Sequence, residues 1–88
     1  MLHKKPRQYT LEEVSEHTAK DSCWIVLSNI VYDVTEYAKD HPGGSNIIYE
    51  NAGKDCTDLF NTLHPWINYK KLLQNNLIGY IKKEQPEK

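Results

Sequence analysis

Two histidines stand where they could bind a metal ion. His41 opens the run His41-Pro42-Gly43-Gly44, in which the proline biases the histidine away from helical backbone. The Pro-Gly pair then favours a tight turn, and Gly44, which has no side chain, lets a flat ligand approach the backbone. A histidine fixed at the edge of such a turn is a candidate metal ligand.

The second candidate ligand is His64, 23 positions after His41. This separation is too long for two histidines on one helix that share a metal at i, i+4 spacing. It suits two ligands that reach a metal from opposite faces of a planar macrocycle. The chain contains no C-x-x-C-H motif, so a haem bound here would be non-covalent and of b type.

The segments that must position these histidines read as short helices. Thr35 is expected to cap a helix at 36–40, and Ser45 a helix at 46–52 that Gly53 ends. After them Asp55 or Thr57 caps a helix that runs through Phe60.

Strands and further helices complete the expected fold. The β-rich runs 24–27 and 30–34 flank Ser28-Asn29 and predict a hairpin, and 77–81 predicts a closing strand. Thr10 and Glu13 form a capping box for a helix that runs to about His17, which we expect to be a solvated histidine. Pro65 fits the first position of another helix.

Composition limits the kind of protein. At 88 residues with a net charge of −1, the chain is one small domain for which nucleic acid is not the expected partner. Cys23 and Cys56 form no C-x-x-C pair, so reduced thiols are expected. No apolar run reaches the roughly 18 residues that a membrane span needs, so we expect a soluble, cytoplasmic monomer.

Four blocks of sequence resemble the cytochrome b5 haem-binding domain. They are Cys23-Trp24-Ile25-Val26-Leu27, Val31-Tyr32-Asp33-Val34-Thr35, His41-Pro42-Gly43-Gly44 and Ala52-Gly53-Lys54-Asp55. The resemblance extends from Tyr9 to Ile81. We therefore expect a flexible segment at 1–8, a haem-binding domain at 9–81 and a charged tail at 82–88.

The resemblance implies a fold and a cofactor site. The fold is α+β, a small mixed sheet with pairs of short helices that form a haem pocket. His41 and His64 match the two axial ligands of the iron of haem b. The other expected haem contacts are Gly43 and Gly44 and the apolar residues Leu27, Val34, Tyr37, Ile48, Phe60, Leu63 and Leu72. The apolar residues would be core residues in any fold.

Two axial imidazoles leave no open coordination position for a substrate, so the implied function is one-electron transfer without substrate chemistry of its own. The implied donor is a flavin-dependent cytochrome b5 reductase, and the acceptor is a protein such as a desaturase or hydroxylase. Residues 36–58 hold five acidic and two basic side chains, whereas the rest of the chain carries a net charge of +2. This acidic segment predicts a docking face for a basic redox partner.

The loop at the second histidine departs from the microsomal cytochromes. The stretch from Phe60 to His64 is one residue shorter, and Pro65 stands where those proteins have a serine that holds a haem propionate. The loop is closer to the b5 domain of fusions with a b5 reductase. Since proline has no N–H or hydroxyl, Asn68 or Tyr69 is expected to hold the propionate instead.

Two other classes of function remain open from the residues alone. Cys23, Cys56, His41 and His64 have the ligand count of a zinc or iron site, although the cysteines lack paired spacing. The second class is a module that binds lipid or protein, like the steroid-binding-like proteins that share the fold. Those relatives typically lack paired axial histidines, which counts against this alternative.

Overall fold

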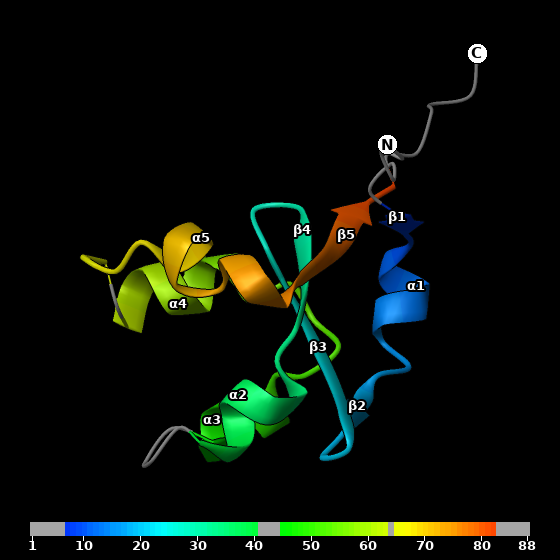
Figure 1. Ribbon diagram of the computed structural model, residues 1–88, viewed down its shortest axis with the longest axis horizontal. Helices are drawn as coiled ribbons and strands as arrows, with labels where there is room; N and C mark the ends of the chain where they lie inside the picture. The colour runs from blue at the N-terminus through cyan, green and yellow to red at the C-terminus, as the bar shows by residue number, and fades with distance from the viewer. Residues whose placement is uncertain (1–6, 41–44, 64, 83–88) are drawn as a thin grey trace.

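Five short strands form one sheet in the computed structural model of the chain, which describes residues 7–40, 45–63 and 65–82. The strands are β1 (Arg7–Tyr9), β2 (Thr18–Ala19), β3 (Ser22–Leu27), β4 (Ile30–Asp33) and β5 (Leu77–Ile81). They lie in the order β1-β5-β4-β3-β2 (Figure 1). Strand β1 runs parallel to β5 and the other neighbours are antiparallel, which confirms the mixed sheet.

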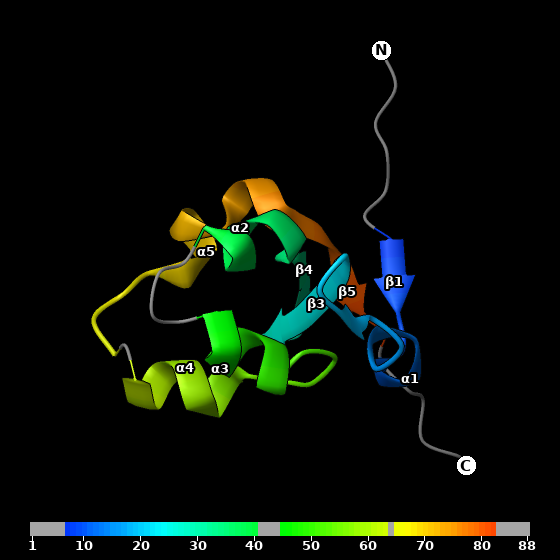
Figure 2. The same cartoon turned by 90° about the horizontal axis from the view of Figure 1, so that it is seen from below.

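Short helices cover both faces of this sheet. They are α1 (Leu11–Val14), α2 (Thr35–Lys39), α3 (Ser45–Glu50), α4 (Thr57–Leu63), α5 (Tyr69–Leu72) and the 3₁₀ helix η1 (Gln74–Asn76). Figures 1 and 2 show α1 on one side of the sheet and α2 to α5 on the other. In Figure 2, α2 and α5 lie on one level and α3 and α4 on another. The expected α+β arrangement is confirmed.

The hairpin between β3 and β4 has the two-residue turn that the sequence predicts. Ser28 and Asn29 have φ values of 52° and 66°, and Leu27 pairs with Ile30 across the turn. Two consecutive residues with positive φ belong to a type I′ turn, whose twist matches that of the strands it joins.

Strand β3 is buried on both faces, which explains its continuous apolar sequence. Cys23, Ile25 and Leu27 point into a large core beneath α2 to α5, here called the helix-side core. Val26 points into a smaller core beneath α1, together with Val14. The helix-side core consists of Cys23, Ile25, Leu27, Tyr32, Val34, Ala38, Ile48, Ala52, Cys56 and Leu73.

Helix α2 is tied to the start of β3 by the side chain of Asp33. The Oδ1 atom of Asp33 accepts hydrogen bonds from the backbone N–H of Thr35 at 3.1 Å and from its hydroxyl at 2.6 Å. The hydroxyl oxygen of Thr35 in turn accepts a bond from the backbone N–H of Cys23 at 2.9 Å. Thr35 was expected to be the cap, but it is the first residue of the helix, the N-cap position is Val34, and the carboxylate of Asp33 accepts the N–H of Thr35.

Helix α4 is tied to the other end of β3 in the same way. The Oδ1 atom of Asp55 accepts bonds from the N–H and hydroxyl of Thr57 at 3.0 and 2.6 Å. The hydroxyl oxygen of Thr57 accepts the N–H of Ser28 at 2.8 Å. Two Asp-x-Thr segments therefore fix two helices to opposite ends of one strand.

The helix before β2 is shorter than expected. The capping box of Thr10 and Glu13 is present, but α1 ends at Val14 rather than near His17. The expected solvated state of His17 is wrong, because its ring is half-buried and stacks on Trp24 at 3.6 Å between ring centroids. Its Nδ1 atom lies 2.7 Å from the hydroxyl of Ser22.

Helix boundaries also differ around the candidate site. Helix α3 runs over Ser45–Glu50 rather than 46–52, and Gly53 follows it with φ of 76°. Gly53 is required there, since a Cβ atom would come within 2.7 Å of the side chain of Thr18. Pro65 does not begin a helix: it lies in a turn, and α5 begins at Tyr69 with Asn68 as its N-cap.

The N-terminal segment 1–8 was expected to be flexible, but its last two residues belong to the sheet. Arg7 and Gln8 belong to β1 and pair with Gly79 and Tyr80 of β5. A polar three-residue strand gives little sequence signal, because its pairing depends on β5, some 70 positions away. The rest of this segment lies outside the described residues.

Candidate functional site

The two expected metal ligands, His41 and His64, lie outside the described residues, and so do Gly43 and Gly44. The elements that lead to them are described. The chain reaches position 41 directly after α2 and Asp40, and it reaches position 64 directly after α4. Each histidine thus follows the end of a short helix whose first turn is tied to β3.

Six of the expected pocket residues gather in or on the helix-side core. Leu27, Val34 and Ile48 are buried in it. Tyr37, Phe60 and Tyr69 are half-buried against it. The structure therefore brings together apolar side chains from β3, α2, α3, α4 and α5.

The helices on either side of position 64 leave apolar side chains uncovered. No residue of α4 or α5 is buried, although α4 carries Leu59, Phe60 and Leu63. Leu63 is 41% exposed and Leu72 on α5 is 53% exposed. Apolar side chains that the fold itself does not bury are those that a flat apolar cofactor would cover, so the residues present fit a haem.

One polar group in the helix-side core has no partner. The hydroxyl of Tyr32 is buried and makes no hydrogen bond within the described part of the chain. Burial, and then the nearby phenols of Tyr69 and Tyr80, raise the pKa of Tyr32. The group therefore stays protonated and is a buried donor.

The two residues expected to hold a haem propionate already have structural roles. The Oδ1 atom of Asn68 accepts the N–H of Lys71 at 3.2 Å, which caps α5. The hydroxyl of Tyr69 is hydrogen-bonded to the hydroxyl of Ser28. The cap of α5 does not use the amide N–H groups of Asn68.

Both cysteines are free, as expected, and both are buried. Burial, followed by the Asp55 carboxylate and the Cys23 thiol, raises the pKa of Cys56 to about 11. Its thiol lies 3.3 Å from the carbonyl of Asn51, to which it donates. Zinc binds the thiolate, and no cluster of three or more metal-binding side chains occurs in residues 7–40, 45–63 and 65–82. The two histidines of that alternative site, His41 and His64, lie outside the described residues.

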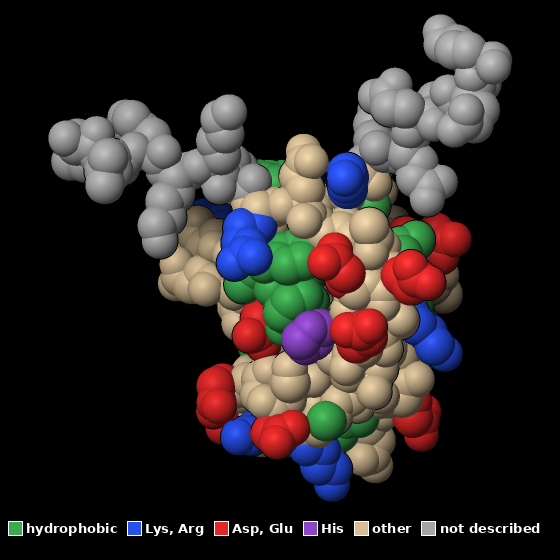
Figure 3. Space-filling view, turned by 90° about the vertical axis from the view of Figure 1, so that its right-hand side faces the viewer, with side chains coloured by type: hydrophobic (Ala, Val, Ile, Leu, Met, Phe, Trp, Pro, Cys, Tyr) green, Lys and Arg blue, Asp and Glu red, His purple; other side chains and the backbone are tan. Residues whose placement is uncertain are grey.

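Acidic side chains lie on both sides of the sheet. The five acids of segment 36–58 are all exposed: Glu36, Asp40, Glu50, Asp55 and Asp58. Figure 3 shows that acidic side chains also gather on the α1 side of the molecule, around an apolar patch. Helix α1 and the residues after it carry Glu12, Glu13 and Glu16. The sign of the charge alone therefore does not select one face as the docking surface.

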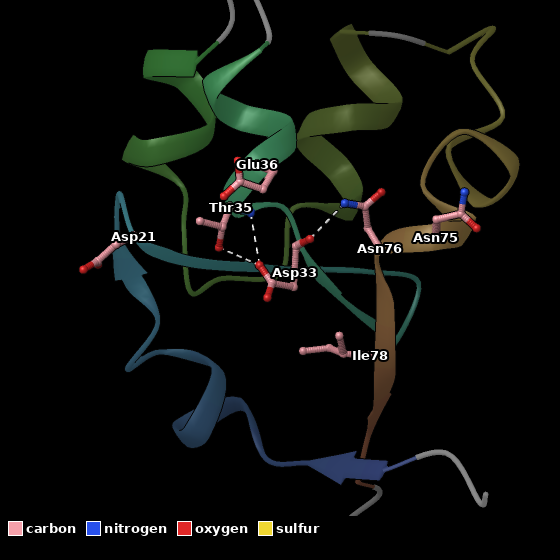
Figure 4. Close-up of a pocket in the computed structure, with 7 residues that line it drawn as sticks. All are labelled: Asp21, Asp33, Thr35, Glu36, Asn75, Asn76 and Ile78. Atoms are coloured by element: carbon pink, nitrogen blue, oxygen red, sulfur yellow. Dashed lines mark hydrogen bonds between the residues drawn. The ribbon is translucent and has the colours of Figure 1, made fainter.

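A polar cavity of about 420 Å³ lies next to the start of α2 and contains none of the expected site residues. Figure 4 shows Asp33 at its centre, bonded to Thr35 and joined to η1 by a hydrogen bond. In that bond the amide of Asn76 donates to the carbonyl oxygen of Asp33 at 3.0 Å. These hydrogen bonds hold α2 and η1 to β4.

The sequence reasoning missed the link between β3 and α4. Asp55 was considered only as a cap, and its partner Thr57 was not connected to Ser28. A signal was present, because Asp33-Val34-Thr35 and Asp55-Cys56-Thr57 repeat the same Asp-x-Thr spacing. The missing partner of the Tyr32 hydroxyl had no such signal.

Comparison with known proteins adds family evidence to this geometry. Residues 10–82 match the model of the cytochrome b5-like heme/steroid binding domain. Cytochrome b5 of Ostreococcus tauri virus 2 has 42% identity and a TM-score of 0.76, over 89% of this chain and 100% of that one. Cytochrome b558 of Ectothiorhodospira vacuolata, a prokaryotic homologue of cytochrome b5, has 34% identity and a TM-score of 0.77, over 86% and 99% of the two chains.

Larger proteins contain similar segments. Cytochrome b5 reductase 4 of Rattus norvegicus is 44% identical over 72 residues, which are 82% of this chain and 14% of that protein. Nitrate reductase [NADH] 1 of Nicotiana tabacum is 45% identical over 75 residues, 85% of this chain and 8% of that protein. The chain thus spans a small part of these relatives. None of its described helices is long and apolar enough to cross a bilayer.

Proposed function

Since the chain belongs to the cytochrome b5-like heme/steroid binding domain family, we propose that it is a one-electron carrier whose iron is held by His41 and His64. Haem binding follows from the family and from the similarity to two cytochromes. The observation that carries the proposal is that α4 and α5, on either side of position 64, contain no buried residue. Apolar side chains of these helices, among them Leu63 and Leu72, are exposed and could pack against the faces of a haem.

The two imidazoles would fill both axial positions of a non-covalent haem b. When bound, haem supplies a one-electron change of the iron between ferric and ferrous. Neither histidine has to leave for this change, so the protein has to provide only a fixed ligand set. Each ring would bind the iron through one nitrogen and donate the N–H of its other nitrogen to a backbone carbonyl or similar acceptor, which sets its orientation.

The apolar residues have a separate role in this proposal. Leu27, Val34 and Ile48, which are buried, would form the floor of the site, and Leu63 and Leu72 would cover its open side. Such a wall excludes water and lowers the local dielectric, and both effects shift the reduction potential. Gly43 and Gly44 would allow close approach of the backbone to the ring.

The propionate contact is assigned to the amide of Asn68. Pro65 offers no donor, and the Tyr69 hydroxyl is bonded to Ser28. Asn68 caps α5 through its oxygen, so its N–H groups can donate to a carboxylate while the cap is kept.

The proposed partners are a flavin-dependent reductase as donor and a basic redox protein, such as a desaturase or hydroxylase, as acceptor. The similarity to segments of a cytochrome b5 reductase and of a nitrate reductase supports a reductase as the donor. The exposed acids of segment 36–58 support a basic acceptor. We propose a monomer that acts in the cytoplasm, free or joined to further domains.

A redox titration with optical detection tests the proposed function. The chain reconstituted with one equivalent of haem should give a single reversible one-electron transition. The spectrum should remain six-coordinate and low-spin on both sides of that transition. A spectrum that becomes five-coordinate on reduction, or a reduced spectrum that changes when carbon monoxide is added, would contradict a carrier with both axial positions filled.

A further inference from the structure

Residues 65–68, before α5, project from the molecule and carry the most exposed large apolar side chain of the described residues. Figures 1 and 2 both show the chain after α4, coloured yellow, extending away from the neighbouring helices. Within the described residues Trp66 is 78% exposed, more than any other large hydrophobic residue, and Ile67 beside it is 37% exposed. The proposed haem wall uses Leu63 and Leu72 but neither Trp66 nor Ile67.

Positive charge follows this apolar tip in the sequence. Lys70 and Lys71, both exposed, lie on α5. The whole stretch 59–82 contains no aspartate or glutamate. The nearest acid before it in the chain, Asp58, is in the first turn of α4. Among the described residues the one salt bridge joins Lys39 and Glu36, so neither lysine of α5 is held in an ion pair there.

We propose that this tip, consisting of Trp66, Ile67, Lys70 and Lys71, binds the surface of an anionic lipid bilayer. Tryptophan prefers the boundary between hydrocarbon and headgroups. Lysines just behind it can place their ammonium groups among anionic headgroups while their methylene chains lie along the apolar region. An apolar tip flanked by lysines thus matches both layers of such a surface.

The shape and size of the tip favour a bilayer over a protein. Specific protein interfaces bury about 800 Å² per partner and are usually well packed. Here two apolar side chains stand on a projecting loop, which would need a matching hollow in a protein partner. A bilayer is deformable and needs no such hollow. The charge of the tip is also opposite to that of segment 36–58, which is proposed to meet a basic protein.

Vesicle sedimentation tests the proposal with the haem-loaded full chain. The chain should sediment with phosphatidylserine–phosphatidylcholine vesicles at physiological salt and remain in solution with phosphatidylcholine alone. Trp66→Ser and the double variant Lys70→Gln/Lys71→Gln should each lower the partition coefficient at least fivefold. Two matched controls should not: Leu11→Ser, an exposed leucine on α1, and Lys20→Gln/Lys54→Gln, which changes the net charge equally.

The absorption spectrum of each variant establishes that haem and fold are retained, so a failure here is distinct from a failure of the electron-carrier proposal. Wild-type chain that stays in solution with the anionic vesicles overturns the proposal, and so does an equal loss in the control variants. The proposal is also overturned if the chain binds the anionic vesicles only at low salt and Trp66→Ser binds them as well as the wild type does. That result would make an acidic protein the better occupant.

Discussion

The buried hydroxyl of Tyr32 lowers the free energy of unfolding, because an unpaired buried donor loses its hydrogen bonds to water on folding. Tyr32→Phe should therefore raise the free energy of unfolding of the haem-free protein by about 1 kcal/mol. Tyr69→Phe is the matched control: it removes a hydroxyl that is bonded to Ser28 and should not stabilise. Urea denaturation of both variants measures the difference. A less stable Tyr32→Phe would mean that the hydroxyl has a partner, such as an ordered water.

The side chain of Asn68 has two roles in this account: its oxygen caps α5, and its N–H groups are proposed to bind a haem propionate. Asn68→Asp keeps an oxygen for the N–H of Lys71 but removes the amide donor proposed for the propionate and adds a negative charge. A charge-assisted hydrogen bond is worth about 1.5–3 kcal/mol, so haem transfer to apomyoglobin should be at least about tenfold faster. Gln8→Glu on β1, with the same chemical change, should have no effect. Unchanged haem transfer in Asn68→Asp would assign the propionate to another donor.

Single residues were predictable where a local rule decided their state. The Thr10–Glu13 capping box and the positive φ of Gly53 follow from neighbouring residues, and both are present. The state of His17 was not predictable, because it depends on Trp24, which reaches it only after β2 and β3 pair. The same holds for Tyr32, whose surroundings come from α5 and β5.

At the scale of elements, the two Asp-x-Thr segments set where α2 and α4 begin. Thr57→Val removes the hydroxyl that joins Asp55 to the N–H of Ser28, and it should lower the free energy of unfolding by about 1–2 kcal/mol. Since α4 leads to position 64, haem should also be lost faster. Thr62→Val, at an exposed position of the same helix, is the control. Equal effects of the two variants would show that the link does not position α4.

Long elements with strong local signals were predicted, and short ones that depend on distant partners were not. Strand β5 has the expected limits, and the β3–β4 hairpin has the expected turn, because apolar runs and a two-residue turn define them. Strand β3 begins two residues earlier than expected and β4 ends one residue earlier. Pro65 was expected to open a helix, but the cap of Asn68 places the start of α5 four residues later. A proline fits the first turn of a helix and also a tight turn, and the sequence does not choose between them.

For the whole molecule, the proposed docking of segment 36–58 to a basic partner predicts a salt dependence. The rate of electron exchange with such a partner should fall as salt rises, since exposed charges are screened within about 8 Å at physiological ionic strength. Glu50→Gln with Asp58→Asn should flatten this dependence. Asp55 is left unchanged because it caps α4.

The matched control lies on the opposite side of the sheet. Glu12→Gln with Glu16→Gln changes the net charge by the same amount at α1, and it should leave the salt dependence as in the wild type. Stopped-flow measurement of the exchange rate compares the three proteins. An equal effect of both pairs would mean that only net charge matters and that no particular face docks.

The most direct measurement for the molecule as a haem electron carrier is the absorption spectrum of the wild type and of two histidine variants. The oxidised and reduced wild type should both be six-coordinate and low-spin. His41→Ala and His64→Ala should each lose that spectrum, because each removes one axial ligand and leaves a five-coordinate haem or an empty pocket. His17→Ala, whose ring stacks on Trp24, should leave the spectrum unchanged. A six-coordinate low-spin spectrum in either His41→Ala or His64→Ala would contradict the assignment of that ligand.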